Sequence, residues 1–129
     1  MMALRLKMKE DSFVMETDFR ELPISPDGVR GFRPYQLMIA AIAGCIANVF
    51  KQILNKMRLE VENIRITANH KRDDKNAGRI KAIHLHFTLK GNHLPEENVK
   101  RALALARKNC SMIQTVQACV HVTESFEIV

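Results

Sequence analysis

The segment PYQLMIAAIAGCIANVFKQILN, residues 34–55, decides the fold of this chain. Pro34 suits the first turn of a helix, because its missing N–H has no partner to lose there. Only Asn48 interrupts the near-apolar run from Leu37 to Phe50, and apolar residues occupy every face of the first three turns. That pattern is typical of a helix that is buried all round. A chain of 129 residues can hardly encircle such a helix by itself, so the pattern favours burial against a second subunit.

Apolar and polar residues alternate on the N-terminal side of this helix. Residues 3–9 alternate Leu and Met with Arg and Lys, which predicts a half-buried strand. Residues 13–19 continue the period of two, so the two segments together predict a β-hairpin. Residues 22–34 contain three Pro and two Gly and therefore predict a loop, which is long enough to form a wall or lid over a site.

Two strands and a second helix follow the apolar helix. The predicted strands are residues 64–69 and 82–89, joined by the charged stretch 71–79. The second helix begins near Pro95 and ends near Lys108, with acids in its first turn and cations in its last. Its apolar stripe has the spacing of an amphipathic surface helix and consists of Val99, Ala102, Leu103 and Ala106.

A closing strand over residues 118–128 completes the pattern. The element order is β-β-α-β-β-α-β, which predicts an α+β fold with a buried central helix and antiparallel strand pairs. The length is that of one domain, so residues 1–129 are predicted to form a single domain.

The composition excludes several classes of protein. With 47% hydrophobic and 26% charged residues, the chain is neither disordered nor collagen-like. Its longest near-apolar run has 14 residues, fewer than the ~20 that a membrane-spanning helix needs. The N-terminus MMALRLKMKE lacks the apolar region of a signal peptide. Three Cys are too few for a secreted disulfide scaffold, so we expect a cytoplasmic protein with free thiols and no membrane partner.

The net charge of +6 raises the question of nucleic-acid binding. The cations are spread along the chain and interleaved with acids, as in residues 71–75. A nucleic-acid surface would need clustered cations and aromatic platforms, and its affinity would fall steeply with salt. Because the chain has one Tyr and no Trp, we interpret the charges as a solvated surface and expect no nucleic-acid partner.

The three cysteines are the first candidates for chemistry. Cys45 lies in the buried helix, where a free thiol is either a small hydrophobic residue or a reactive group. Cys110 follows two cations and precedes a possible helix start at Ser111, and both features would lower the pKa of its thiol. Cys119 heads the predicted last strand and is interpreted as having no role. No two of the three have the spacing of a redox CxxC pair or of zinc ligands.

Histidines are the second candidates. His84 and His86 share one face of a predicted strand, and His70 falls on the neighbouring strand. Three imidazoles could hold a metal ion, but no carboxylate accompanies them at a ligand spacing, so we favour solvent-facing polar residues. The chain also lacks a Gly-rich phosphate loop, a serine nucleophile elbow and HExxH, and we expect neither a metal nor a cofactor.

Two segments resemble the OsmC/Ohr superfamily. In the first, GFRPYQLMIAAIAGC at residues 31–45, a Pro-led helix start is followed by small and aliphatic residues and then a Cys. In the second, residues 102–106 and then NCSMIQTV at 109–116 resemble the second Cys of the family with its short following helix. The separation of 65 residues between Cys45 and Cys110 and the element order agree with this resemblance, which covers nearly the whole chain.

The resemblance implies a fold, an assembly and an activity. Members form an intertwined homodimer with each first-Cys helix at its centre, and the peroxidase branches act in the stress response by reducing organic hydroperoxides. Carried over to this chain, Cys45 is the peroxidatic thiol and Cys110 resolves its sulfenic acid as a disulfide, which an external dithiol then reduces. Because burial raises the pKa of a thiol, a cation is expected to hold the Cys45 thiolate.

This chain departs from the Ohr branch at one position. That branch places a Glu ten residues before the first Cys, where it positions an activating Arg, but this chain has Tyr35 there, with Gln36 next to it. Arg20 and Arg33 are candidate activating residues, as are Arg5 and Arg30. The chain is therefore more similar to the short OsmC-like branch.

The same residues are also compatible with a function that involves no catalysis. A non-catalytic OsmC-like dimer would bind a small apolar ligand in its interface cleft, with both cysteines buried or idle. The two hypotheses differ in a simple observation, since only the peroxidase requires a Cys45–Cys110 disulfide to form when peroxide is added.

Overall fold

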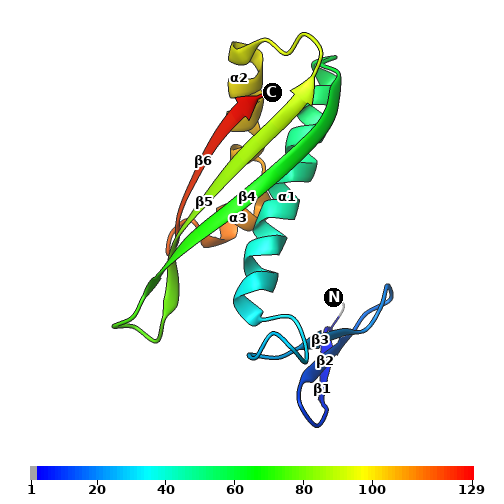
Figure 1. Cartoon of the computed structure of the whole chain (residues 1–129), viewed down its shortest axis with the longest axis vertical. Coiled ribbons are helices and arrows are strands. Elements are labelled where there is room, and N and C mark those ends of the chain that lie inside the picture. Colours follow the sequence, from blue (N-terminus) through cyan, green and yellow to red (C-terminus); the bar gives the residue numbers. More distant parts are fainter. Residues whose placement is uncertain (1–2) are drawn as a thin grey trace. The chain divides into compact units, whose positions relative to one another are not determined.

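The computed structural model describes residues 3–129, which divide into two compact units at the boundary between Ala40 and Ala41 (Figure 1). Helix α1 (Pro34–Lys56) begins in the first unit and ends in the second. Its bounds confirm the apolar helix predicted over residues 34–55. The fold is the mixed α+β arrangement that the sequence predicts, and it contains two three-stranded sheets, one in each unit. The observed element order contains one strand and one short helix more than predicted.

The first unit is built on an antiparallel sheet of three short strands. Strands β1 (Arg5–Met8), β2 (Phe13–Glu16) and β3 (Leu22–Ile24) pair in the order β1-β2-β3, which confirms the predicted hairpin. The predicted loop 22–34 is wrong at its start, because β3 forms there. Pro23 is tolerated since β3 is an edge strand, where a missing backbone N–H removes no bond from the sheet interior.

The apolar face of the first hairpin is uncovered in the single chain. Leu4, Leu6 and Met8 are 71%, 52% and 77% exposed, although their alternation predicts a half-buried strand. In β2 the buried residue is Val14, whereas Phe13 is 52% exposed. The strand forms as predicted, but all four residues of β1 are exposed, so the prediction that it is half-buried is wrong.

The second unit is a three-stranded sheet with helices on one face. Strands β4 (Val61–Asp73), β5 (Arg79–Gly91) and β6 (His121–Ile128) lie in the order β4-β5-β6. The later turns of α1, with α2 (Glu96–Lys108) and α3 (Ser111–Val116), lie against the same face of this sheet (Figure 1). Alternate residues of β5 point into this core and are essentially inaccessible: Ile83, Leu85, Phe87 and Leu89.

Two predictions about the strands are corrected by the structure. β4 and β5 form a hairpin longer than predicted, so only residues 74–78 connect them instead of 71–79. β6 begins at His121 rather than at residue 118, and it pairs with β5 in parallel rather than antiparallel fashion. The parallel pairing is possible because α2 and α3 form a crossover long enough to return the chain to the starting end of β5.

Helix α1 buries one stripe and leaves the opposite one open. Ile42, Ile46, Phe50 and Leu54, spaced by one turn, are at most 2% exposed, and the Phe50 ring meets Phe87 of β5 edge to face at 5.4 Å between centroids. Gly44 and Asn48 are exposed, so the expected burial on every side is not achieved within one chain. By length and composition α1 is also apolar enough to cross a membrane, a test that core helices of soluble proteins pass as well.

Helix α2 matches its prediction closely. Its predicted apolar stripe is its buried face: Val99, Ala102, Leu103 and Ala106. Glu96 and Glu97 lie in its first turn and Arg107 and Lys108 in its last, which suits the helix dipole at both ends. The helix ends two residues before Cys110 and thereby sets the entry of the chain into α3.

Candidate functional site

Cys45 and the start of α3 meet in the second unit, although they are far apart in the sequence. Cys45 lies midway along α1 and is partly accessible. Its Sγ is 3.7 Å from the Ser111 Oγ, across a separation of 66 residues. The structure therefore brings the two cysteines of the predicted pair to one place, since Ser111 directly follows Cys110.

Hydrogen bonding lowers the pKa of the Cys45 thiol below its ordinary value. The largest cause is the backbone N–H of Met112, and the side chains of Cys110 and Ser111 and the N–H of Ser111 act in the same direction. Burial opposes them but does not prevail. All of these donors are neutral groups of residues 110–112. Such N–H, O–H and S–H groups stabilise a thiolate without a cation, and the expectation that a cation also holds it stays a prediction.

Cys110 has the opposite electrostatic environment. Its side chain is fully buried between α2 and α3, and this burial raises the pKa of the Cys110 thiol above its ordinary value, with the neighbouring Cys45 acting in the same direction. The prediction of a lowered pKa is wrong because it counted nearby cations in the sequence and not the direction of their side chains. The two thiols thus differ, with Cys45 favoured as thiolate and Cys110 as neutral thiol.

Arg107, one of those cations, is directed to the sheet. Its Nη1 donates to the Val122 carbonyl at 2.7 Å and to the carboxylate of Glu124. Burial raises the pKa of Glu124 above its ordinary value, although Arg107 opposes this effect. The Arg107 carbonyl accepts the Cys110 N–H at 3.3 Å, so this residue fixes the segment that carries the second thiol. Sequence reasoning missed the pair because it joins α2 to β6.

Cys119 lies apart from this pair. It is exposed and belongs to the turn that ends α3, where its N–H donates to the Val116 carbonyl at 2.9 Å. Its carbonyl accepts a hydrogen bond from Arg79 at 3.1 Å. The prediction that Cys119 heads the last strand is therefore wrong, because helical hydrogen bonding continues through this turn and delays the strand to His121.

The remaining predicted site residues belong to the first unit. Gln36 Oε1 accepts the Arg33 N–H at 3.3 Å at the start of α1, and Arg33 Nη2 donates to the Asp27 carbonyl at 3.3 Å. The Arg20 guanidinium lies 5.5 Å from the centroid of the Phe19 ring. Tyr35 is partly buried in the first turn of α1. A role of these residues toward Cys45 stays a prediction.

The loop of the first unit borders a hollow, as a wall would. The hollow has a volume of about 670 Å³. Phe32, Gln36 and Leu37 are among the residues that line it. The predicted wall therefore has a counterpart within the first unit, although its use by a ligand stays a prediction.

His84 and His86 form part of a hydrogen-bonded chain across β5 and β6. His84 Nδ1 is 2.6 Å from Thr123 Oγ1, and His84 Nε2 is 2.9 Å from Ser125 Oγ. His86 Nδ1 is 2.6 Å from the same Ser125 Oγ, and His86 Nε2 is 3.3 Å from Glu127 Oε1. These contacts lie on the sheet face opposite the helices, because Ile83, Leu85 and Phe87 of the same strand point into the core.

When both histidines are neutral, only one assignment of donors and acceptors satisfies all four hydrogen bonds. A carboxylate only accepts, so His86 Nε2 must donate to Glu127, and Nδ1 then accepts from the Ser125 hydroxyl. Ser125 Oγ in turn accepts from His84 Nε2–H, which leaves His84 Nδ1 to accept from Thr123. The structure therefore agrees with the interpretation of His84 and His86 as polar residues on the solvent side of the strand. Within residues 3–129, no group of three His, Cys, Asp or Glu side chains could hold a metal ion.

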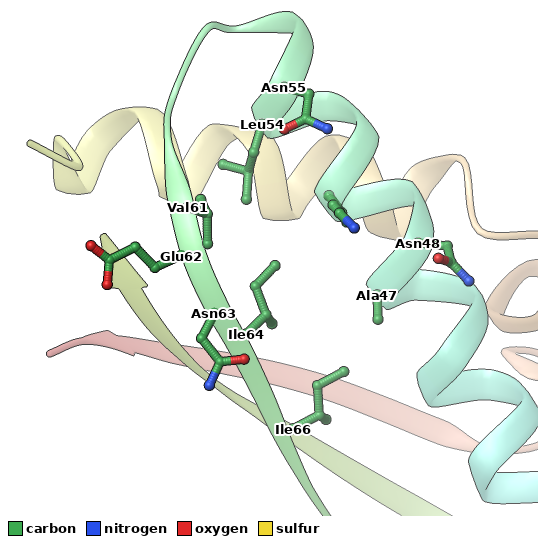
Figure 2. Close-up of a pocket in the computed structure, with 10 residues that line it drawn as sticks. Ala47, Asn48, Leu54, Asn55, Val61, Glu62, Asn63, Ile64 and Ile66 are labelled. Carbon is green, nitrogen blue, oxygen red and sulfur yellow. The ribbon is translucent and has the colours of Figure 1, made fainter. Parts of the chain in front are cut away.

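A groove of about 340 Å³ lies between α1 and the start of β4 (Figure 2). Figure 2 shows Leu54 of α1 and Ile64 and Ile66 of β4 pointing into the space between helix and strand, whereas Glu62 points away. Polar and charged residues also line the groove, among them Asn48, Lys51 and Asn55, so its lining is mixed. Such a groove suits a small ligand with both apolar and polar groups.

Comparisons with known proteins agree with this architecture. The Escherichia coli (strain K12) protein YhfA is 31% identical over 97 residues, which cover 74% of this chain and 72% of YhfA. The crystal structure of a hypothetical protein from Aquifex aeolicus VF5 matches with a TM-score of 0.88 at 24% identity, over 98% of this chain and 95% of that one. The organic hydroperoxide resistance protein OhrB of Bacillus subtilis matches with a TM-score of 0.67 at 16% identity, over 98% of each chain.

A family profile gives the assignment that these similarities support. The profile of the family described as OsmC-like protein matches residues 26–125, which include α1 with Cys45, the whole β4–β5 hairpin, and α2 and α3 with Cys110. The resemblance seen in the two cysteine segments is thereby confirmed, and this chain belongs to the OsmC-like protein family.

Proposed function

We propose that this protein is a thiol-dependent hydroperoxide reductase in which Cys45 attacks the peroxide and Cys110 resolves the product as a disulfide. The observation that carries the proposal is the pairing of two unlike thiols. Hydrogen bonds from residues 110–112 lower the pKa of Cys45, whereas burial raises the pKa of Cys110. The likeness in fold to OhrB, an organic hydroperoxide resistance protein, supports an organic hydroperoxide as substrate.

The first step uses the thiolate as a nucleophile. Cys45 Sγ attacks one oxygen of the O–O bond, the bond breaks, and the other oxygen leaves as an alkoxide that takes a proton to become an alcohol. Sulfur is oxidised to sulfenic acid and the peroxide is reduced. Only the thiolate reacts in this way, so donors that favour the charged form of Cys45 raise the fraction of reactive enzyme.

The second step requires a thiol that does not react with the peroxide itself. The Cys110 sulfur attacks the sulfenic sulfur of Cys45, the S–O bond breaks, and the hydroxyl leaves as water with the proton of Cys110. Since burial keeps Cys110 protonated and away from solvent, it is protected from direct oxidation. An external dithiol then reduces the disulfide by exchange and is itself oxidised.

We further propose that the working unit is a homodimer in the cytoplasm. Three uncovered features support this assembly: the exposed stripe of α1, the apolar side chains of β1, and the free edge of β4. Each would cost free energy in contact with water, and long free strand edges invite pairing with another chain. A second copy of this chain supplies the same complementary surfaces and closes the assembly by symmetry.

The second candidate is a non-catalytic dimer that binds a small apolar ligand. The groove between α1 and β4, to which Leu54, Ile64 and Ile66 contribute apolar side chains, favours this alternative. It predicts cysteines that do not respond to peroxide, and the experiment below therefore separates the two functions.

The decisive experiment adds one equivalent of tert-butyl hydroperoxide to the fully reduced protein. The peroxidase proposal expects the three free thiols per chain to fall to one, with a Cys45–Cys110 cross-link identified by mass spectrometry. If all three thiols survive excess peroxide, the peroxidase proposal fails and ligand binding becomes the better explanation.

Three single variants serve as controls for the thiol count. Cys119→Ser removes the exposed thiol and leaves the pair intact, so it should react as the wild type does. Cys45→Ser should abolish the loss of thiols. Cys110→Ser should stop at the sulfenic acid, which dimedone traps on Cys45.

A further inference from the structure

The thiolate of Cys45 is stabilised by hydrogen-bond donors from the start of α3. Tyr35 stands where the Ohr branch has the carboxylate that positions an activating arginine. The donors that lower the pKa of Cys45 are instead the neutral groups of residues 110–112. Among these groups, two are backbone N–H groups and one is a thiol that the reaction consumes. The hydroxyl of Ser111 is the remaining side-chain donor.

We propose that Ser111 is a catalytic residue whose hydroxyl donates a hydrogen bond to the Cys45 thiolate and thereby favours the reactive, ionised form of Cys45. The Ser111 Oγ lies 3.7 Å from the Cys45 Sγ, within the range of an O–H···S hydrogen bond. The effect of this contact on the reactivity of Cys45 toward an alkylating agent does not depend on the proposed function. Its consequence for peroxide reduction rests on the function proposed above.

The contact favours one charge state of the thiol. When Cys45 is neutral, either the thiol or the hydroxyl can donate, so the hydrogen bond is weak and interchangeable. When Cys45 is ionised, its sulfur can only accept, and the hydroxyl must donate to a negative charge. Hydrogen bonds to charged groups are about twice as strong as neutral ones, so the contact stabilises the thiolate more than the thiol.

The surrounding structure holds the Ser111 backbone in place. Thr115 Oγ1 donates to the Ser111 carbonyl at 2.7 Å, and the Gln114 N–H donates to the Cys110 carbonyl at 3.0 Å. The Arg107 carbonyl accepts the Cys110 N–H from the preceding helix. Because the backbone is fixed on both sides, the hydroxyl reaches Cys45 by rotation of a single side-chain bond, which loses little conformational entropy.

The test measures the alkylation of Cys45 by iodoacetamide in reduced protein over a range of pH. Mass spectrometry follows the Cys45 peptide, and the exposed Cys119 of the same molecule serves as an internal reference. For Ser111→Ala, we expect alkylation of Cys45 at pH 7 to slow by about three- to tenfold, and the midpoint of its pH profile to move upward. Ser111→Thr keeps the hydroxyl and should restore most of the rate.

The control is Thr67→Ala, which removes an exposed hydroxyl from β4, on the sheet face away from the helices, and leaves the hydrogen bonds around Ser111 in place. It should leave the pH profile of Cys45 close to that of the wild type. An unchanged profile in Ser111→Ala, or an equal change in Thr67→Ala, overturns the inference. Failure of the wild type to react with peroxide refutes the proposed function instead, and leaves the alkylation result to decide the role of Ser111.

Discussion

Arg107 joins the last turn of α2 to the covered face of β6, where its guanidinium donates to both the Val122 carbonyl and the Glu124 carboxylate. The Glu124 side chain is only 10% exposed in this pair, and that of Arg107 is 33% exposed. The same residue accepts hydrogen bonds from Cys110 and Gln114 at its carbonyl oxygen. The guanidinium of Arg107 thus contacts the sheet while its carbonyl holds the Cys110 backbone, so Arg107 links the buried thiol to the sheet.

Removing the guanidinium leaves a buried carboxylate without its cation. We expect Arg107→Ala to lower the free energy of unfolding by about 2–3 kcal/mol, less than for a fully buried pair because Arg107 is partly solvated. Urea denaturation at a fixed protein concentration measures the change. The double variant Arg107→Leu with Glu124→Leu should recover part of the loss, and a double variant that is no more stable than Arg107→Ala would contradict this explanation.

The raised pKa of Glu124 predicts a dependence of stability on pH. Burial makes ionisation of Glu124 less favourable in the folded chain than in the unfolded one, so the folded state holds its proton to higher pH. The contribution of Glu124 is therefore most favourable below its ordinary pKa of 4.5, and it declines as pH rises through the folded pKa. Compared with Glu124→Gln, the wild type should lose stability over this range in urea titrations. A constant difference between the two proteins would show that Glu124 does not titrate abnormally.

Two arginines of the first unit test whether a cation activates Cys45. Arg33 donates to the Asp27 carbonyl and Arg20 lies over the Phe19 ring, whereas the donors around Cys45 are neutral. We expect Arg20→Ala and Arg33→Ala each to change the rate of Cys45 alkylation at pH 7 by less than about twofold. Stopped-flow measurement with iodoacetamide gives the rates. A tenfold or greater loss in either variant would identify that arginine as an activating cation.

The tautomers of His84 and His86 follow from the direction of their hydrogen-bonded chain. At a pH where both rings are neutral, each should carry its proton on Nε2, since Glu127 accepts at one end and Thr123 donates at the other. Two-bond ¹H–¹⁵N correlation spectra distinguish the two tautomers directly. In Ser125→Ala the link between the rings is lost, and we expect about 1 kcal/mol lower stability because water replaces the partly exposed hydroxyl. A ring protonated on Nδ1 in the wild type would contradict this assignment of donors and acceptors.

The features that sequence alone predicted are those with local causes. The stripe of α2 is buried as expected because the period of 3.6 residues fixes which side chains share a face. Cys119 illustrates the limit of such patterns, since the apolar residues around it alternate as in a strand while α3 continues through the turn. The alternation could not reveal this, because a short helix is stabilised by the contacts that surround it.

The chemistry of the site depends on contacts that no local pattern contains. The Cys45–Ser111 contact joins two residues 66 positions apart, so its existence follows from the packing of α3 against α1. The pKa of Cys110 was predicted in the wrong direction for the same reason. Two cations in the sequence suggested a lowered pKa, but the fold turns Arg107 to Glu124 and buries the thiol. Charge in the sequence predicts an electrostatic effect only when the side chain also points to the group.

Gly44 provides a direct test of the proposed dimer. It lies on the exposed stripe of α1, and a Cβ at this position would meet nothing within 4 Å in the single chain. A larger side chain there is harmless to an isolated chain and improves helix propensity by up to about 1 kcal/mol. Against a second subunit packed on this stripe, the same side chain would clash. We therefore expect Gly44→Leu to weaken the dimer, which sedimentation velocity over a range of concentrations in reducing buffer will detect.

The control for this variant adds a leucine elsewhere on the surface. Ala104 is exposed on α2, outside the three features proposed for the interface. Ala104→Leu should leave the dimer intact and exclude a general effect of added apolar surface. If Gly44→Leu remains as dimeric as the wild type, the exposed stripe of α1 is not the interface. A wild type that sediments as a monomer at every concentration removes the dimer altogether, and the uncovered helix would then need a different occupant, for which its apolar surface favours a hydrophobic one.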